Sequence, residues 1–245
     1  MTVTLLPGRD TTDAALESAP SVPQCYIENT WWCPYYWSDR RPELVEALIQ
    51  HLELTVASVA VGLAFAFPLA LLARRYGRLE STVLAVTTMI YTIPSLALFS
   101  LFAPYTGLTA RTVIIGLALY SLTILVRNIL AGLQAVPGDV REAAIGSGYG
   151  AGRMLLQIEL PLAMPVIMAG LRVATVSTVA LVTVGSIVGP YGGLGNLLLD
   201  AVSSQFRAQI LAASVLCVAL AVALDLLLVV AQRLATPWTR VGGKG

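Results

Sequence analysis

"QAVPGDVREAAIGSGYGAGRMLLQIELP", residues 134–161, is a polar stretch between two long apolar runs. Pro137 and Gly138 predict the end of the preceding helix, and Asp139 with Glu142 resembles an acidic capping box that opens a short new helix. The glycines that predict a bend after this helix are Gly146, Gly148, Gly150 and Gly152. A second short amphipathic helix is expected next, and its apolar side chains are Met154, Leu155 and Ile158. Long connections with such internal order often carry function.

The composition around this stretch is that of a membrane protein. Hydrophobic residues make up 57% of the chain and charged residues 12%, whereas soluble domains carry about 25% charged residues. A helix needs about 20 mostly apolar residues to cross a hydrocarbon core of roughly 30 Å. We therefore predict an all-α integral membrane protein with five spans, near residues 54–74, 83–103, 112–133, 164–188 and 208–232.

These spans divide the chain into a transmembrane domain and its flanking segments. The transmembrane domain is predicted over residues 51–235, and a cytoplasmic loop over 136–161 joins its third and fourth spans. The flanking segments are an N-terminal tail at 1–50 and a C-terminal tail at 236–245. Pro161 suits the first turn of the helix that follows the loop.

The distribution of basic residues predicts the orientation. With five spans, ten of the 15 Lys and Arg residues fall on one side of the membrane and five on the other. Cytoplasmic loops carry the excess of Lys and Arg, so the side that holds the loop 136–161 is predicted to be cytoplasmic. The N-terminus is then outside and the C-terminus inside. Cys25 and Cys33 would lie in an oxidising compartment, where a disulfide between them can persist.

The polar stretch also carries a spaced pattern of seven residues: Glu142, Ala143, Ala144, Gly148, Ile158, Leu160 and Pro161. Their spacing resembles the EAA loop of the permease subunits of ABC importers. The resemblance implies a MetI-like, five-span type I importer core. In that family the loop forms a short coupling helix, which docks into a groove on a cytoplasmic ATPase subunit and passes its nucleotide-driven closure to the membrane helices.

Further stretches are similar to the osmoprotectant branch of these permeases, which carries glycine betaine, choline, carnitine or proline betaine. They are residues 91–99, 118–128, 159–176 and 192–200. The resemblance implies a plasma membrane of a prokaryote, a second permease chain (identical or a sister), two ATPase subunits and an extracytoplasmic solute-binding protein. ATP and Mg would be bound by the ATPase, because this chain has no phosphate loop. No catalytic constellation, metal-ligand cluster or nucleic-acid partner is predicted.

Candidate pathway residues lie in three places. Pro94 and Ser95 stand in the second span, where the proline allows a kink. Thr178 and Ser186 lie among the small residues of the fourth span, which favour close helix packing and could also line a polar route. The outer turn between spans four and five is predicted to act as a gate, and its glycines are Gly192, Gly193 and Gly195.

Three charges lie within the predicted spans near their cytoplasmic ends: Arg127, Arg172 and Asp225. Charges in a membrane pair with one another or face a wet cavity. Either arginine could pair with Asp225 and hold spans together, or both could extend to the interface as snorkelling side chains.

The segment 29–37, "NTWWCPYYW", gathers aromatic residues around Cys33 in the outer tail. Three interpretations stay open: an aromatic cage for a quaternary ammonium ligand, a surface that docks the binding protein, and a cap or belt at the membrane interface. A disulfide between Cys25 and Cys33 would close the segment on itself.

Other functions remain as alternatives at this point. A permease for another small solute, such as methionine or another amino acid, belongs to the same class. An ion-coupled secondary transporter would be expected to have an internal repeat and an acidic residue near the membrane midplane, whereas Asp225 lies near the cytoplasmic end of its span. An intramembrane enzyme would need a nucleophile and a base, for which no pair is evident.

Overall fold

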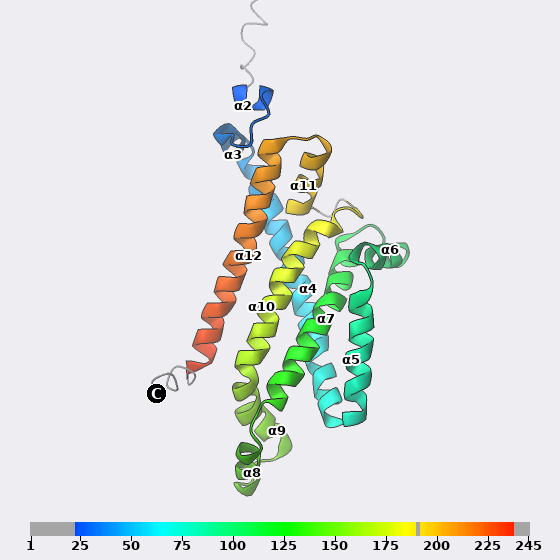
Figure 1. Ribbon diagram of the computed structural model, residues 1–245, viewed down its shortest axis with the longest axis vertical. Helices are drawn as coiled ribbons and strands as arrows, with labels where there is room; N and C mark the ends of the chain where they lie inside the picture. The colour runs from blue at the N-terminus through cyan, green and yellow to red at the C-terminus, as the bar shows by residue number, and fades with distance from the viewer. Residues whose placement is uncertain (1–22, 190–191, 238–245) are drawn as a thin grey trace, which may run out of the picture.

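The computed structural model describes residues 23–189 and 192–237, and within them every regular element is a helix. Four helical segments are long and apolar enough to cross a membrane, and they run side by side along the long axis of the molecule (Figure 1). They are α4 (Arg41–Arg75), α7 (Ala110–Gln134), the continuous segment Ala151–Gly185 that ends in α10 (Leu160–Gly185), and α12 (Arg207–Ala235).

The predicted second span, 83–103, is wrong as a single helix. The structure has α5 (Gly77–Thr92) and α6 (Ser95–Thr106), which meet at 94°. Ile93 is extended and Pro94 has no backbone N–H, so the helix stops before the proline. The Tyr120 hydroxyl donates a hydrogen bond to the freed carbonyl of Ile93. The count of five spans holds when this bent pair is taken as one.

One further boundary differs from the prediction. The predicted N-terminal tail overlaps α4, which already begins at Arg41, with Pro42 in its first turn, where a missing N–H costs nothing. Residues 1–22 of the tail and residues 238–245 of the C-terminal tail lie outside the described residues.

The core forms where α7 packs between α4 and α10. Its largest cluster joins Leu125, Val126, Ile129 and Leu133 of α7 to small residues of α4 such as Ala70. Gly170 allows α10 to approach α7 closely, because a Cβ at this position would lie only 2.3 Å from the Cβ of Asn128. Small residues at helix interfaces are the usual way in which membrane helices approach one another.

The polar stretch 134–161 forms α8 (Gly138–Gly146), α9 (Ala151–Met154) and the π-helical turn η1 (Leu155–Glu159). The predicted capping box is wrong, because Pro137 is the N-cap of α8 and no side chain caps it. Pro161 lies in the first turn of α10, as predicted, although η1 runs directly into this helix. Pro161 cannot bond the preceding turn, and the residues before it adopt the wider π-helical turn.

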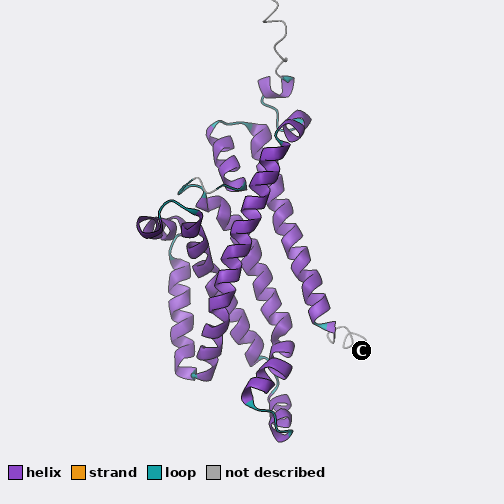
Figure 2. Ribbon diagram, turned by 180° about the vertical axis from the view of Figure 1, so that it is seen from behind, coloured by secondary structure: helices purple, strands orange, loops and turns teal. Residues whose placement is uncertain are grey.

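The two ends of the molecule carry different elements. One end holds α8 and α9, which project beyond α7 and α10 (Figure 1). The opposite end holds α2 (Gln24–Ile27), α3 (Pro34–Asp39) and α11 (Leu194–Ser203), and the view from behind shows the same separation (Figure 2). The predicted coupling segment and the predicted outer segments therefore lie at opposite ends of the helices that would cross the membrane.

Candidate functional site

The first half of the seven-residue pattern lies on α8. Glu142 and Ala143 are exposed, as is the apolar Ile145 at 62%, while Ala144 is the one buried residue of the helix. Gly148 follows with φ +80, in the left-handed region that favours glycine, and a Cβ there would have open space around it. The helix thus presents an uncovered surface with a carboxylate and an apolar side chain, followed by a bend at Gly148.

The second half of the pattern lies where the loop enters the membrane helix. Ile158 is in η1, and Leu160 and Pro161 are the first residues of α10. Leu160 packs against the core that α7 and α4 form. The pattern therefore joins an exposed helix at one end to a turn packed against the bundle at the other.

A buried ion cluster sits at this junction, and the sequence did not single it out. Glu159 is 2% exposed, and its carboxylate accepts two hydrogen bonds from Arg74, one of them at 2.7 Å. Arg141 of α8 forms an ion pair with the same carboxylate at 3.0 Å and donates to the carbonyl of Leu133. The only sign of this ion cluster in the sequence was the carboxylate of Glu159 between the apolar residues Ile158 and Leu160. Both arginines are far from Glu159 in the chain.

The intramembrane charges pair selectively. Arg172 of α10 donates two hydrogen bonds to Asp225 of α12, from Nε to Oδ1 at 2.7 Å and from Nη2 to Oδ2 at 2.8 Å. Arg127 instead donates to Thr88 Oγ1 at 2.7 Å, which joins α7 to α5. The paired geometry of Arg172 and Asp225 is the strong, bidentate kind, and it fixes α12 to α10.

Of the pathway candidates, Pro94 and Ser95 lie at the bend between α5 and α6, with Pro94 exposed. Thr178 and Ser186 are buried, and their hydroxyls donate to carbonyls of their own segment, those of Ala174 at 2.7 Å and Thr183 at 2.6 Å. In this conformation both therefore act as packing residues.

The outer glycines lie where α4, α10 and α11 meet. Gly192 and Gly193 have φ +82 and +78, and the Gly193 N–H donates to Gln50 Oε1 at 2.8 Å. Beside them His51 is fully buried, with Nε2 3.1 Å from the carbonyl oxygen of Val179. Gly195 abuts Ser186, since a Cβ there would lie 2.2 Å from the serine Oγ. The turn is thus held against α4 by the Gln50 hydrogen bond, and its backbone approaches α4 and α10 closely.

The aromatic segment forms a packed cap at the end of the molecule that holds α3 and α11. A disulfide joins Cys25 to Cys33, and the ring of Phe206 packs edge-on against Tyr26 and Tyr36 at centroid distances of 5.3 and 5.5 Å. Burial raises the pKa of Tyr36 to about 12, so its phenol stays protonated. The aromatic rings of Tyr26, Tyr36 and Phe206 therefore pack against one another.

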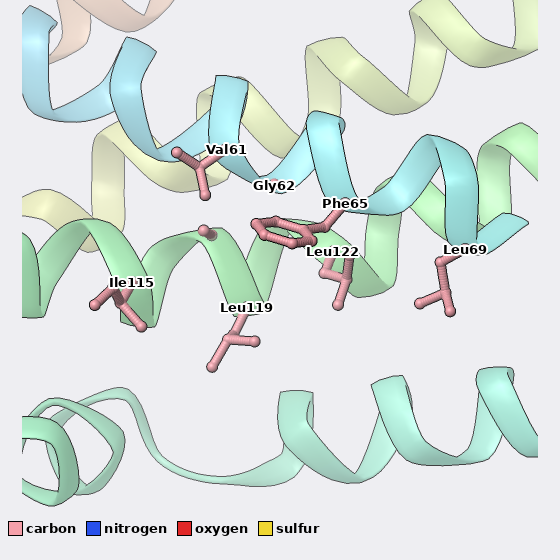
Figure 3. Close-up of a pocket in the computed structure, with 8 residues that line it drawn as sticks. Val61, Gly62, Phe65, Leu69, Ile115, Leu119 and Leu122 are labelled. Atoms are coloured by element: carbon pink, nitrogen blue, oxygen red, sulfur yellow. The ribbon is translucent and has the colours of Figure 1, made fainter.

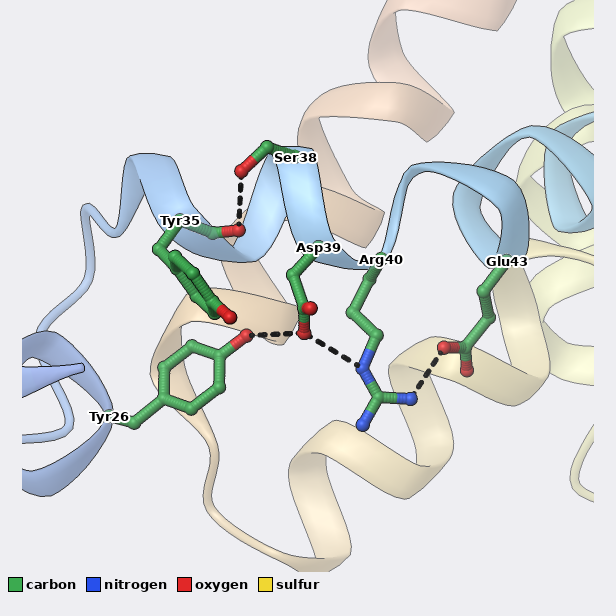
Figure 4. Close-up of polar contacts among 6 residues, drawn as sticks. All are labelled: Tyr26, Tyr35, Ser38, Asp39, Arg40 and Glu43. Atoms are coloured by element: carbon green, nitrogen blue, oxygen red, sulfur yellow. Dashed lines mark hydrogen bonds and ion pairs between the residues drawn. The ribbon is translucent and has the colours of Figure 1, made fainter. Parts of the chain in front are cut away.

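Polar contacts tie the cap to the helices below it. Asn29 donates to the carbonyl of Gln205 at 2.8 Å and accepts from the Arg207 N–H at 2.9 Å, at the turn before α12. Within the cap, Asp39 contacts the Tyr26 hydroxyl at 3.5 Å and Arg40 at 3.7 Å (Figure 4). Trp31 and Trp32 remain exposed on its surface.

An apolar groove of about 450 Å³ lies between α4 and α7, and Phe65 of α4 extends over it (Figure 3). The residues that line it are Val61, Gly62, Phe65, Leu69, Ile115, Ala118, Leu119 and Leu122. Its lining offers no charged or hydrogen-bonding side chain to a polar solute. Among the described residues no group of His, Cys, Asp and Glu could hold a metal ion.

Comparison with known proteins identifies the family. Residues 58–241 match the family described as "Binding-protein-dependent transport system inner membrane component". The chain belongs to this family, the permease subunits of ABC importers, as its coupling-loop pattern predicts. It is accordingly a multi-pass membrane protein and a transport subunit.

Two relatives are similar along most of the chain. The osmoprotectant import permease protein OsmW of Salmonella typhimurium is 34% identical over 208 residues, which cover 83% of this chain and 96% of the relative. The glycine betaine/carnitine/choline transport system permease protein OpuCD of Bacillus subtilis is 34% identical over 203 residues, covering 82% and 88%.

A solved structure confirms the predicted fold. A chain from the inward-facing MetNI methionine ABC transporter superposes with a TM-score of 0.71, covering 81% of this chain and 98% of that chain. At 20% sequence identity this similarity shows the fold alone. It confirms the MetI-like, all-α architecture.

Proposed function

We propose that this chain forms, with a second permease chain, the membrane pathway of an ATP-driven importer for a small osmoprotectant such as glycine betaine, choline, carnitine or proline. The names of the relatives OsmW and OpuCD support the solute class. Their similarity extends over more than four-fifths of this chain, so it includes the membrane helices as well as the coupling loop.

The observation that carries the proposal is the surface of α8. It presents Glu142, Ala143 and Ile145 to solvent at one end of the molecule and is followed by the bend at Gly148. This surface suits docking into a groove of an ATPase subunit, which would bind ATP and Mg. Two such subunits, one for each permease chain, would draw the two α8 helices together on ATP binding and open the pathway outward; hydrolysis would reset it.

In the proposed orientation α8 lies in the cytoplasm and the cap lies outside. Ten Lys and Arg residues on the α8 side against five on the other support it. An extracytoplasmic binding protein would deliver the solute to the end that holds the cap and α11. The second permease chain would meet part of the surface of α12, because only 6% of the apolar window of that helix is buried within this chain.

The pathway itself would run along the bent pair and α10. The break at Pro94 and Ser95 gives α6 its own direction, so that it can move independently of α5. The outer turn with Gly192, Gly193 and Gly195 would act as the gate. Thr178 and Ser186 would contribute to the route only in another conformation of α10, since both are buried here.

The docking claim is tested by a charge reversal on α8, at Glu142, and by a new charge at the bend directly after it, at Gly148. Glu142→Lys and Gly148→Asp should abolish co-purification of the ATPase with the permease. Glu80→Lys is the matched control, because Glu80 lies at the same end of the molecule on α5 and makes one exposed hydrogen bond, to Gln134. If the ATPase still co-purified in full with both α8 variants, α8 would not be the docking helix.

A permease for another solute, such as an amino acid, is the second candidate. The methionine transporter shares the fold at 20% identity, whereas relatives at 34% carry osmoprotectant names. The higher identity favours an osmoprotectant. Competition of unlabelled methionine with labelled glycine betaine for uptake separates the two candidates.

A further inference from the structure

The docking helix α8 is joined to the membrane helices mainly through one carboxylate. Ala144 is the only buried residue of α8, so the helix has little packed interface of its own. The segment after it passes through Gly148 and Gly150, which allow backbone movement. A push on α8 would be absorbed in this bend unless something else links the helix to the bundle.

The ion cluster at Glu159 supplies that link. Arg141 extends from α8 to Glu159 Oε1 at 3.0 Å, and the same carboxylate accepts two hydrogen bonds from Arg74 at the end of α4. Glu159 itself is the last residue of η1, directly before α10. One carboxylate therefore joins α8, α4 and α10.

Arg141 adds a fourth helix to the cluster. Its Nη2 donates to the carbonyl of Leu133, which is among the last four residues of α7. Carbonyls in the last turn of a helix have no partner within the helix, and a cationic side chain there satisfies one of them and opposes the helix dipole. The arginine thus connects α8 to the end of the helix that precedes it as well as to Glu159.

Side-chain packing does not fill the space beside these ionic contacts. A hollow of about 380 Å³ lies beside the cluster, between the end of α4 and the segment that contains α9 and η1. Its lining includes Arg74 and Glu159 themselves, together with Leu71 and Met154. The ion pair spans this opening, while Leu71 of α4 and Leu155 of η1 pack against the core beside it. A π-helical turn such as η1 is also often found at functional sites.

We propose that Glu159 is the positioning residue through which movement of the docking helix reaches the membrane helices. The proposal rests on the proposed function, in which α8 docks an ATPase. Glu159, held between Arg141 and Arg74, makes α8, α4 and the start of α10 move as one unit. Without the carboxylate, α8 would still dock but would move on its glycine bend.

The test uses the whole complex of permease, ATPase and binding protein in proteoliposomes, with radiolabelled glycine betaine as the solute. Glu159→Gln keeps the shape of the side chain and removes its charge. The variant should retain the ATPase at wild-type stoichiometry, while solute transported per ATP hydrolysed falls about tenfold, within the usual range of coupling between sites. Glu159→Asp keeps the charge and should restore most of the ratio, and Glu80→Gln, an exposed carboxylate at the same end, should leave it unchanged.

Two outcomes overturn the proposal: an unchanged ratio in an assembled Glu159→Gln complex, or loss of ATPase binding in that variant. If Glu159→Gln does not fold, Arg141→Gln decides, because it removes the tie on the α8 side and leaves Glu159 with Arg74. An assembled Arg141→Gln complex with an unchanged ratio would refute the link. A wild-type chain that binds no ATPase would instead refute the proposed function, so the two failures are distinguishable.

Discussion

Gly148 allows the bend of the docking loop to be tested quantitatively. Its φ of +80 lies in the left-handed region, and a Cβ added there would have no neighbour within 4 Å. Gly148→Ala therefore introduces backbone strain without a steric clash inside the chain. Holding an L-residue in this region costs about 1–2 kcal/mol.

The strain should appear as a loss of ATPase affinity. If the proposed docking requires the bend and the undocked loop can relax, the cost falls on the bound state. A cost of about 1–2 kcal/mol corresponds to an affinity about 5–30-fold weaker for Gly148→Ala. Gly148→Asn should lose less, because asparagine tolerates this conformation better than other non-glycine residues.

Gly150→Ala is the matched control for this series. Gly150 has φ −73 and equally open surroundings, so alanine fits there without strain. The assay is a titration of the purified ATPase onto the permease in nanodiscs, with the dissociation constant measured for each variant. Equal affinities for Gly148→Ala and Gly150→Ala would refute the claim that docking needs the left-handed bend.

Two further predictions concern the Arg172–Asp225 pair and the cap. Asp225→Ala leaves Arg172 without its bidentate partner and should lower the Tm more than Arg127→Ala, which removes one hydrogen bond; equal Tm shifts for the two would contradict the pairing. Mass spectrometry of the non-reduced protein should find Cys25 and Cys33 linked, and Cys33→Ser should weaken the cap by roughly 2–3 kcal/mol, seen as faster hydrogen exchange at residues 24–39 with unchanged exchange in α7. Free thiols at both positions would contradict the linked cap.

The class of protein was predictable from the sequence because its signals are local. An uncharged run that is long enough to cross a membrane indicates a span, whichever helices it packs against in the fold. The coupling pattern between Glu142 and Pro161 depends only on spacing along the chain. Family membership and the all-α fold followed from these features, and both are confirmed.

The sequence predicted that Pro94 allows a kink but not that the helix ends there, because the two prolines Pro68 and Pro94 behave differently. Pro68 lies inside α4 without ending it, next to Ala66 and Ala70, which are fully buried against neighbouring helices. Pro94 ends α5, and the carbonyl of Ile93 finds a partner in Tyr120. Tertiary contacts decide which proline breaks a membrane helix, and the sequence around each does not reveal them.

The ion cluster was missed for a similar reason. Arg74 stands 85 residues before Glu159 in the sequence, and charge counting assigns it to orientation alone. Only the fold brings the end of α4 to the start of α10. The Arg172–Asp225 pair was one of two pairings left open by the sequence, and the packing of α12 against α10 selects it.

ATP-driven uptake in proteoliposomes tests the proposed function most directly. The reconstituted permease, with its ATPase and an extracytoplasmic binding protein, should accumulate radiolabelled glycine betaine only when ATP and Mg are supplied on the side of α8. Uptake should persist when ionophores collapse every ion gradient, and unlabelled choline or carnitine should compete while methionine does not. Uptake without ATP that depends on an ion gradient, or competition by methionine alone, would contradict the proposed function.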